Sequence, residues 1–331
     1  MPGTDAARPP APAARVGVLV MSHGTPPSPG DVAAFYTEIR RGSPPSPEQL
    51  ADLERRYDAI GGVSPLTERT RDQVSGIAHA LEVMAPGRFV VAGGAKFAAP
   101  RIEDAVAQLA VAGVARIVGV VLAPHAAEVS VGEYARRARA AVGALPEDGA
   151  GAPRPALTVV EHWHLAAGFT ELLAGRVSAA LEALAPGVRR QAVVLFTAHS
   201  VPTRFVEAGD PYAAQVAETA AAVAAEAMLE HWEVCWQSAG RTADAWLGPD
   251  LLEVLRSLGA KGVPAVVVCP AGFVSDHLEV LYDIDIEARA VAEKAGLALS
   301  RTASLNADPR FCEILACVVL EAAGTPAGWV G

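Results

Sequence analysis

The sequence predicts an α/β protein with two domains, each built on a parallel β-sheet flanked by helices. Three observations support this fold class. The chain has 331 residues, which is enough for two domains of about 100–200 residues each. Short apolar runs alternate along the chain with longer stretches of helical periodicity. These apolar runs are continuous, which is typical of parallel strands buried on both faces.

The elements follow from the same patterns in chain order. The predicted strands are the runs rich in Val and Ile at residues 16–21, 89–92, 115–122, 157–160, 192–196 and 263–269. The predicted helices are the stretches with helical spacing of Ala, Leu and charged residues at 67–84, 103–112, 169–184, 211–230 and 251–258. In such folds ligands bind at the carboxyl ends of the strands.

An internal repeat supports two related halves. Residues 18–26 match residues 194–202 at Val, Leu, His and Pro, which sets His23 opposite His199. A second match, of Val120–Pro124 with Val266–Pro270, continues without a gap until Glu133 stands opposite Glu279. Each half is therefore expected to carry one strand that ends in His and a later strand followed by a helix that contains Glu.

The predicted boundaries follow from composition. Residues 1–15, rich in Ala and Pro, are expected to be a disordered lead-in. Residues 16–155 form the first domain and residues 156–331 the second, with a hinge in the Gly- and Pro-containing stretch 146–155. Within the first domain, the Arg-rich residues 31–71 have no counterpart in the second half and are predicted to be an insertion over its ligand edge.

Charge and composition exclude several function classes. A net charge of −10 disfavours non-specific binding to nucleic acid or to anionic lipid. The chain has no apolar run of the roughly 18 residues that would span a membrane. Four cysteines are too few for a disulfide scaffold, and the first 15 residues lack the apolar core of a signal peptide. We therefore expect a cytoplasmic protein.

The common cofactor signatures are missing from the sequence. It contains no G-x-G-x-x-G, no G-x-x-x-x-G-K-[ST], no H-E-x-x-H and no C-x-x-C. A bound dinucleotide, a P-loop nucleotide or a structural zinc is therefore not expected.

One histidine and three carboxylates are the candidate site residues. His199 directly follows a predicted buried strand, where it could ligate a transition metal, accept a proton or simply hydrogen-bond backbone. Glu279, Asp283 and Glu287 are spaced i, i+4 and i+8, which would place them on one face of a helix, where like charges repel. A solvated acidic face is the alternative, but apolar residues fill the positions between them. The pattern favours a site for divalent cations.

Two further segments remain open to more than one interpretation. Residues 236–250 are rich in turn residues and contain two tryptophans, which could pin a loop to the core or line a pocket for a flat ligand. His162 and His164 could form a metal-binding pair, but they have no third ligand nearby in the sequence, which favours a structural role.

Taken together, these motifs resemble the ferrochelatase family over about residues 16–324, nearly the whole chain. The motifs are Phe196–Pro202, Trp236–Asp250, Gly272–Asp285, His23–Pro26, Tyr36–Gly42, Arg56–Pro65 and Val121–His125. Their arginine-bearing forms resemble the Gram-positive branch, whose members are coproporphyrin III ferrochelatases. The resemblance implies two similar Rossmann-like domains with the active-site cleft between them.

The resemblance also implies a reaction. The enzyme would insert Fe²⁺ into coproporphyrin III, release two protons and yield Fe-coproporphyrin III (coproheme) in haem biosynthesis. His199 and Glu279 would be the catalytic, iron-handling pair, and Asp283 and Glu287 would form the outer iron path. The residues implied to contact the porphyrin are His23, Arg40, Arg56, Tyr57, Ser64 and Tyr134. An Arg-rich insertion suits a substrate with four carboxylates.

Other activities stay open at this point. Protoporphyrin IX or another tetrapyrrole such as sirohydrochlorin could be the substrate, and the metal could differ. A non-catalytic porphyrin- or haem-binding protein is a second alternative, although it would not need both His199 and the carboxylates. The expected partners are porphyrin and Fe²⁺ alone, with the protein a monomer.

The sequence departs from the family pattern at three places. His23 stands where the branch usually has Tyr, and we expect it to bind the iron of the product. Phe97 stands where the branch often has His. Some relatives hold a [2Fe–2S] cluster through a Cys-rich tail, whereas the cysteines here are Cys235, Cys269, Cys312 and Cys317. No cofactor beyond the Fe²⁺ substrate is expected, because four thiolates would have to converge.

Overall fold

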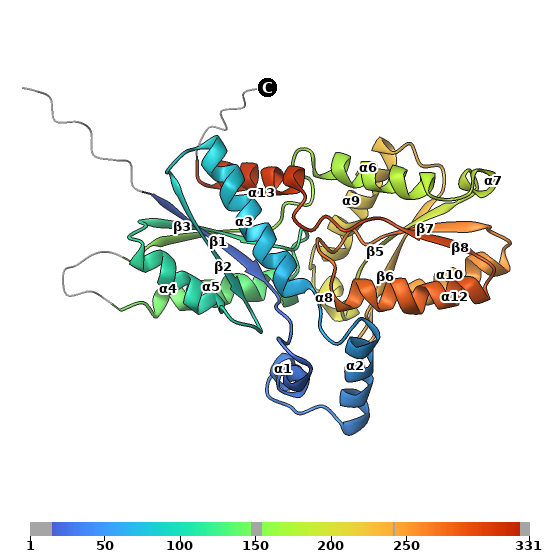
Figure 1. Cartoon of the computed structure of the whole chain (residues 1–331), viewed down its shortest axis with the longest axis horizontal. Helices are drawn as coiled ribbons and strands as arrows, with labels where there is room; N and C mark the ends of the chain where they lie inside the picture. Colours follow the sequence, from blue (N-terminus) through green and yellow to red (C-terminus); the bar gives the residue numbers. More distant parts are fainter. Residues whose placement is uncertain (1–14, 147–153, 241, 325–331) are drawn as a thin grey trace, which may run out of the picture.

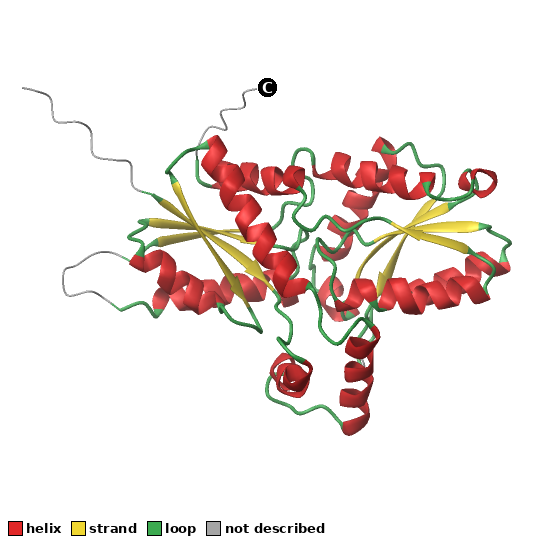
Figure 2. Ribbon diagram, viewed as in Figure 1, coloured by secondary structure: helices red, strands yellow, loops and turns green. Residues whose placement is uncertain are grey.

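The computed structural model describes residues 15–146, 154–240 and 242–324. Within these residues the chain forms two four-stranded parallel sheets, each with helices on both faces (Figure 2). The first sheet has the order β2 (Phe89–Ala95), β1 (Val16–Ser22), β3 (Arg116–Val121) and β4 (Ala156–Val160). The second has the order β6 (Trp232–Gln237), β5 (Val193–His199), β7 (Ala265–Cys269) and β8 (Ala298–Arg301). The predicted fold class is confirmed.

The longer helices cover the two faces of each sheet (Figure 1). On the first sheet, one face carries α3 (Leu66–Met84) and α13 (Pro309–Ala322), and the other carries α4 (Ile102–Val111) and α5 (Glu133–Gly143). On the second, one face carries α6 (Phe169–Glu182) and α9 (Tyr212–Glu226), and the other carries α10 (Leu251–Ala260) and α12 (Arg289–Lys294). The shorter helical segments are η1 (Pro29–Asp31), η2 (Glu128–Gly132), α7 (Pro186–Arg189), α8 (Thr203–Glu207), α11 (Leu278–Leu281) and η3 (Asp283–Ala288).

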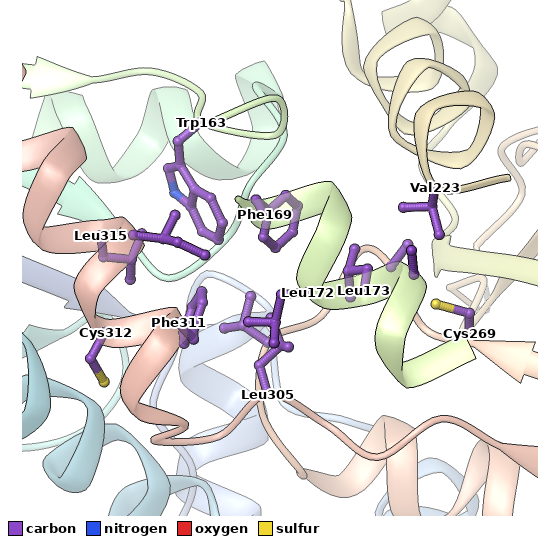
Figure 3. Packing of buried hydrophobic residues seen from close by; sticks show 14 of the residues in the cluster. Trp163, Phe169, Leu172, Leu173, Val223, Cys269, Leu305, Phe311, Cys312 and Leu315 are labelled. Carbon is purple, nitrogen blue, oxygen red and sulfur yellow. The ribbon is translucent and has the colours of Figure 1, made fainter. Parts of the chain in front are cut away.

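One hydrophobic cluster runs through both halves (Figure 3). It joins Val18 of β1 to Val194 of β5 through the aromatic side chains between the two sheets. The Trp163 ring lies 4.9 Å from the Phe169 ring and 5.8 Å from the Phe311 ring, measured between centroids. Burial of this apolar surface therefore holds the two sheets together.

The predicted domain boundary at residues 155/156 is wrong. β4, which was expected to begin the second domain, pairs in parallel with β3 and completes the first sheet. The C-terminal helix α13 also packs against α3 of the first half. Most of the predicted hinge, residues 147–153, and the lead-in up to residue 14 lie outside the described residues.

Two strands were not predicted, and both lack a long apolar run. β6 contains Glu233 between aromatic and apolar residues, and β8 has only the four residues Ala-Leu-Ser-Arg. Each is an edge strand, so its sequence need not be continuously apolar.

The Arg-rich insertion forms two helices that project from the first half, α1 (Val32–Ile39) and α2 (Pro47–Ala59) (Figure 1). α2 begins with a capping box, in which the Ser46 hydroxyl accepts from the Gln49 backbone while the Gln49 side chain accepts from the Ser46 backbone. Pro47 occupies the first turn, where no backbone donor is needed. None of the helices among the described residues is long and apolar enough to cross a membrane.

Candidate active site

His199 is held at the end of β5 with one ring nitrogen free to act. Its Nδ1–H donates to the Ser200 carbonyl at 2.5 Å, and the Tyr212 hydroxyl donates to the His199 carbonyl at 3.0 Å. The other nitrogen, Nε2, lies 3.5 Å from Oε1 of Glu279. Burial lowers the pKa of His199, but the charge and hydrogen bond of Glu279 oppose it and raise the pKa to about 9.

Glu279, in the first turn of α11, lies between two imidazoles. Its second oxygen, Oε2, is 3.6 Å from Nε2 of His277, whose Nδ1–H donates to the Ser275 carbonyl at 3.0 Å. Burial raises the pKa of Glu279, but His199 and His277 together hold it well below its usual value. His277 was not among the site residues predicted from the sequence. The signal was available, because His277 stands two residues before Glu279 at the helix start.

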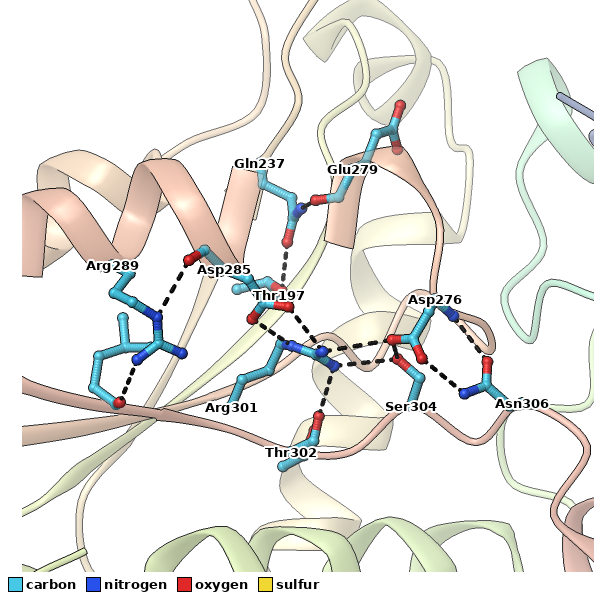
Figure 4. A network of polar contacts seen from close by, with 11 residues as sticks. Thr197, Gln237, Asp276, Glu279, Asp285, Arg289, Arg301, Thr302, Ser304 and Asn306 are labelled. Atoms are coloured by element: carbon cyan, nitrogen blue, oxygen red, sulfur yellow. Dashed lines mark hydrogen bonds and ion pairs between the residues drawn. The ribbon is translucent and has the colours of Figure 1, made fainter. Parts of the chain in front are cut away.

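Gln237 fixes the backbone of Glu279 from the end of β6. The Thr197 hydroxyl donates to Oε1 of Gln237 at 2.7 Å, and Nε2 of Gln237 donates to the Glu279 carbonyl at 2.9 Å (Figure 4). Gln237 is only 2% exposed, so this chain of bonds is rigid and shielded. Gln237 was not predicted from the sequence; an amide at the end of the Trp232–Gln237 strand was the available signal.

The predicted single α-helix with three aligned carboxylates is wrong. After α11 the chain passes through Tyr282 into the π-helix η3, where the Glu287 backbone N–H donates to the Tyr282 carbonyl five residues earlier. The wider π-helical turn changes the angle between Asp283 and Glu287 around the helix axis. The i, i+4, i+8 spacing therefore does not place the three carboxylates on one helix face. Single π-helical turns are frequent at functional sites.

Asp283 is buried beside Glu279 and joins the two halves. It accepts from the Ser238 hydroxyl at 2.5 Å and pairs with Nη1 of Arg56 at 3.3 Å. Burial and the charge of Glu279 raise the pKa of Asp283 to about 6, although Ser238 and Arg56 act in the opposite direction. Ser238, which the sequence analysis also missed, has a φ of 60°, a strained value for a residue with a side chain.

The first half contributes His23 to the same region. The His23 ring is exposed, hydrogen-bonds the Gly24 carbonyl through Nδ1 at 3.0 Å and packs 4.9 Å from the Phe97 ring. Although one side of the ring is open, the protein atoms packed around it remove part of its solvent, which lowers the pKa of His23; Lys96 adds to this, while the Gly24 carbonyl and Glu279 act to raise it. The charge of Glu279 thus reaches His23 across the boundary between the halves.

The implied porphyrin-contact residues are not all equally placed. Arg40 is partly exposed, with its guanidinium 5.6 Å from the Tyr36 ring centroid, and Arg56 faces Asp283. By contrast, Tyr57, Ser64 and Tyr134 are 4%, 7% and 4% exposed. The Tyr57 and Thr25 hydroxyls hydrogen-bond each other at 3.3 Å, and Tyr134 lies beneath Lys96, 4.8 Å from its ammonium. Contact of these three side chains with a porphyrin stays a prediction.

The family model described as "Ferrochelatase" matches residues 15–323. The chain belongs to the ferrochelatase family. Two relatives, both named "Coproporphyrin III ferrochelatase", are 43% identical over 308 residues (Anoxybacillus flavithermus; 92% of this chain, 96% of that protein) and 41% identical over 308 residues (Geobacillus thermodenitrificans; 92% and 95%). The solved structure of "SirB from Bacillus subtilis with Fe3+" has a TM-score of 0.57 and 13% identity, covering 93% of this chain and 96% of that one, which shows a shared fold. The resemblance seen in the sequence is confirmed.

The residue types at this site are suited to both a divalent cation and a proton. Glu279 and Asp283 provide oxygen ligands suited to a divalent cation, and His199 provides a nitrogen that can hold a proton or a metal. Among the described residues, no three His, Cys, Asp or Glu side chains converge into a preformed metal site. Iron is here a substrate that passes through the site.

The cysteines and the histidine pair lie apart from this chemistry. Cys235, Cys269 and Cys312 are buried, and burial raises the pKa of the Cys269 thiol to about 12 and of the Cys312 thiol to about 11. His164 is buried, and its Nε2 hydrogen-bonds Oε2 of Glu218 at 2.9 Å. His162 is exposed, and the centroids of the His162 and His164 rings are 5.2 Å apart. In residues 236–250, Trp236 is buried, 5.7 Å from the Tyr212 ring, so it pins the strand end to the core.

Proposed function

We propose that this chain is a coproporphyrin III ferrochelatase: it inserts Fe²⁺ into coproporphyrin III, releases two protons and yields Fe-coproporphyrin III in haem biosynthesis. The observation that carries the proposal is the cluster of His199, Glu279 and His277, in which two imidazole nitrogens face one carboxylate between the two halves. Relatives at 41–43% identity that bear this name support the choice of porphyrin.

The site residues would divide the work between cation and proton. Fe²⁺ would approach along Glu287 and Asp283 and reach Glu279 and His199, where the negative charge offsets the desolvation of the ion. His199 would accept a pyrrole proton through Nε2, and Glu279 would stabilise the imidazolium that forms. This pairing is suited to coupling the entry of a cation to the loss of a proton.

The porphyrin carboxylates would be met by arginines from the insertion. Arg40 caps the C-terminal end of α1 and Arg56 lies on α2, while Glu279 of the second half is near enough to influence His23. A guanidinium binds a carboxylate through two parallel hydrogen bonds, so these side chains suit a substrate with four such groups. We further propose that the enzyme is a cytoplasmic monomer, with no resident cofactor.

The test is anaerobic Fe²⁺ insertion with coproporphyrin III and with protoporphyrin IX, comparing wild type with Glu279→Gln. We expect kcat/KM to be higher with coproporphyrin III and insertion by Glu279→Gln to fall by about 10²-fold or more. Tight porphyrin binding without turnover in wild type would contradict the enzyme proposal. A preference for protoporphyrin IX would contradict the choice of substrate. Visible absorbance of a cluster after anaerobic purification would contradict the absence of a cofactor.

A further inference from the structure

The segment that carries the metal-handling side chains cannot hold its own shape. Residues 276–287 comprise a four-residue α-helix, Tyr282 and a π-helix, and they carry His277, Glu279 and Asp283. Such short and irregular helical turns are marginal without outside support. The spacing between Glu279 and Asp283 must therefore be fixed from elsewhere in the fold.

One guanidinium holds both ends of this segment. Arg301, the last residue of β8, donates from Nε to Oδ1 of Asp285 at 2.8 Å and from Nη2 to Oδ2 at 2.9 Å (Figure 4). The same Nη2 lies 3.5 Å from Oδ1 of Asp276, and Nη1 donates to Ser304 at 3.2 Å and to the Thr302 carbonyl at 3.0 Å. Bidentate pairing of this kind fixes orientation as well as distance.

The two carboxylates that Arg301 holds are neighbours of the site residues in the chain. Asp276 immediately precedes His277, and Asp285 lies in η3 between Asp283 and Glu287. Arg301 itself is only 15% exposed, and the Glu279 carboxylate points away from this network (Figure 4). Arg301 thus acts on the site only through the backbone of the segment.

We propose that Arg301 is a positioning residue for metal transfer, which sets the separation of Glu279 and Asp283 by clamping Asp276 to Asp285. The inference rests on the proposed ferrochelatase function, because it assigns these carboxylates to the iron path. Loss of Arg301 should weaken the handling of the metal while leaving the porphyrin side of the site, built from the first half, intact.

Arg289 offers a matched control. It also bridges η3 and β8, but only through backbone carbonyls, donating to Asp285 at 3.2 Å and to Leu299 at 3.4 Å. Arg301→Gln and Arg289→Gln therefore remove the same group from neighbouring places, and only the first breaks the bridge between the two carboxylates. Asp276 keeps its hydrogen bonds from Ser304 and Asn306, whereas Asp285 loses its bidentate partner.

The experiment measures the KM for Fe²⁺, the dissociation constant of coproporphyrin III by fluorescence quenching and the affinity for Zn²⁺ by calorimetry, well below each variant's thermal midpoint. For Arg301→Gln we expect the KM for Fe²⁺ to rise and Zn²⁺ affinity to fall, each by about 10–100-fold. Porphyrin binding, and all three values in Arg289→Gln, should stay within about twofold of wild type. Asp285→Asn added to Arg301→Gln should cost nothing further.

Two results would overturn the inference. An unchanged Zn²⁺ affinity in Arg301→Gln would show that the clamp does not set the metal ligands. An equal loss of porphyrin and metal binding would show a general structural role. Because Zn²⁺ binding needs no turnover, it tests the inference separately: failure of wild type to insert Fe²⁺ contradicts the proposed function instead.

Discussion

The two halves place corresponding residues at the ends of corresponding strands, but the charge of these residues differs between the halves. His23 directly follows β1, and His199 is the last residue of β5; each of these strands has neighbours on both sides. The register of the adjacent strands sets Lys96 of the first half at the place of Gln237 of the second. One half thus has a buried cation where the other has a neutral amide.

This difference decides what each carboxylate can do. In the first half the Lys96 ammonium donates to Oε2 of Glu133 at 2.7 Å, so that carboxylate already holds a positive charge. In the second half Gln237 bonds only the backbone of Glu279, which leaves both carboxylate oxygens to His199 and His277. From this difference we infer that the second half receives the cation, whereas the Glu133 carboxylate of the first half is already paired with Lys96.

The two strand-end histidines should differ most in their effect on kcat when each is replaced separately. We expect His199→Ala to lower kcat for Fe²⁺ insertion by about 10²–10⁴-fold, because it removes the proton acceptor. His23→Ala should lower kcat far less, because His23 faces the porphyrin side. Steady-state kinetics under anaerobic conditions measures both, and equal losses in the two variants would break the comparison.

The pH dependence of cation binding should identify the half that binds. With the pKa of His199 at about 9, a cation must displace its proton at lower pH, so Co²⁺ affinity should rise about tenfold per pH unit between pH 6 and 9. In Glu279→Gln the pKa of His199 falls, since burial then acts without the opposing charge, and the rise should end at lower pH. Calorimetric titration of Co²⁺ across this range checks the shift. His23→Ala is the control and should keep the wild-type profile; a flat profile in wild type would count against the assignment.

The buried cation of the first half should matter for stability. Lys96 is 5% exposed, so Lys96→Met removes the partner of Glu133 and should lower the free energy of unfolding by about 1–3 kcal/mol. Because Glu133 is partly exposed, the cost stays below that of a fully buried pair. The double variant Lys96→Met/Glu133→Gln should recover part of the loss in urea unfolding. No recovery would show that the pair is not coupled.

Two glycines test the contact between the halves, and the smaller of their two expected changes is the smallest considered. A Cβ at Gly76 of α3 would lie 2.5 Å from Sγ of Cys312 on α13, so Gly76→Ala should lower stability by about 1–3 kcal/mol. Gly175, in α6, has open space around it, and Gly175→Ala should raise stability by about 0.5–1 kcal/mol. Thermal unfolding of both variants measures the contrast. Equal effects would mean that α13 does not pack closely on the first half.

The sequence was sufficient for the buried parts of the fold. β1, β3, β5 and β7 are the inner strands of the two sheets, and their largely apolar sequences reflect burial on both faces. β6 and β8 are edge strands without such runs, and β4 was assigned to the wrong domain because strand pairing depends on contacts distant in sequence.

The site residues that could be predicted are those whose residue type and local position in the sequence were informative by themselves. His199 after a buried strand and Glu279 at a helix start do meet, at 3.5 Å. The positions of Gln237 and Ser238 depend on the approach of β6 to α11, and the π-helix depends on tertiary support, so neither follows from local periodicity.

The central claim is that the second half alone receives the metal, and anomalous diffraction tests it most directly. Crystals of the protein soaked in Zn²⁺ should show a peak between Nε2 of His199 and the carboxylate of Glu279, with no peak at the Glu133 carboxylate beside Lys96. A peak at Glu133, or none between His199 and Glu279, would contradict the account.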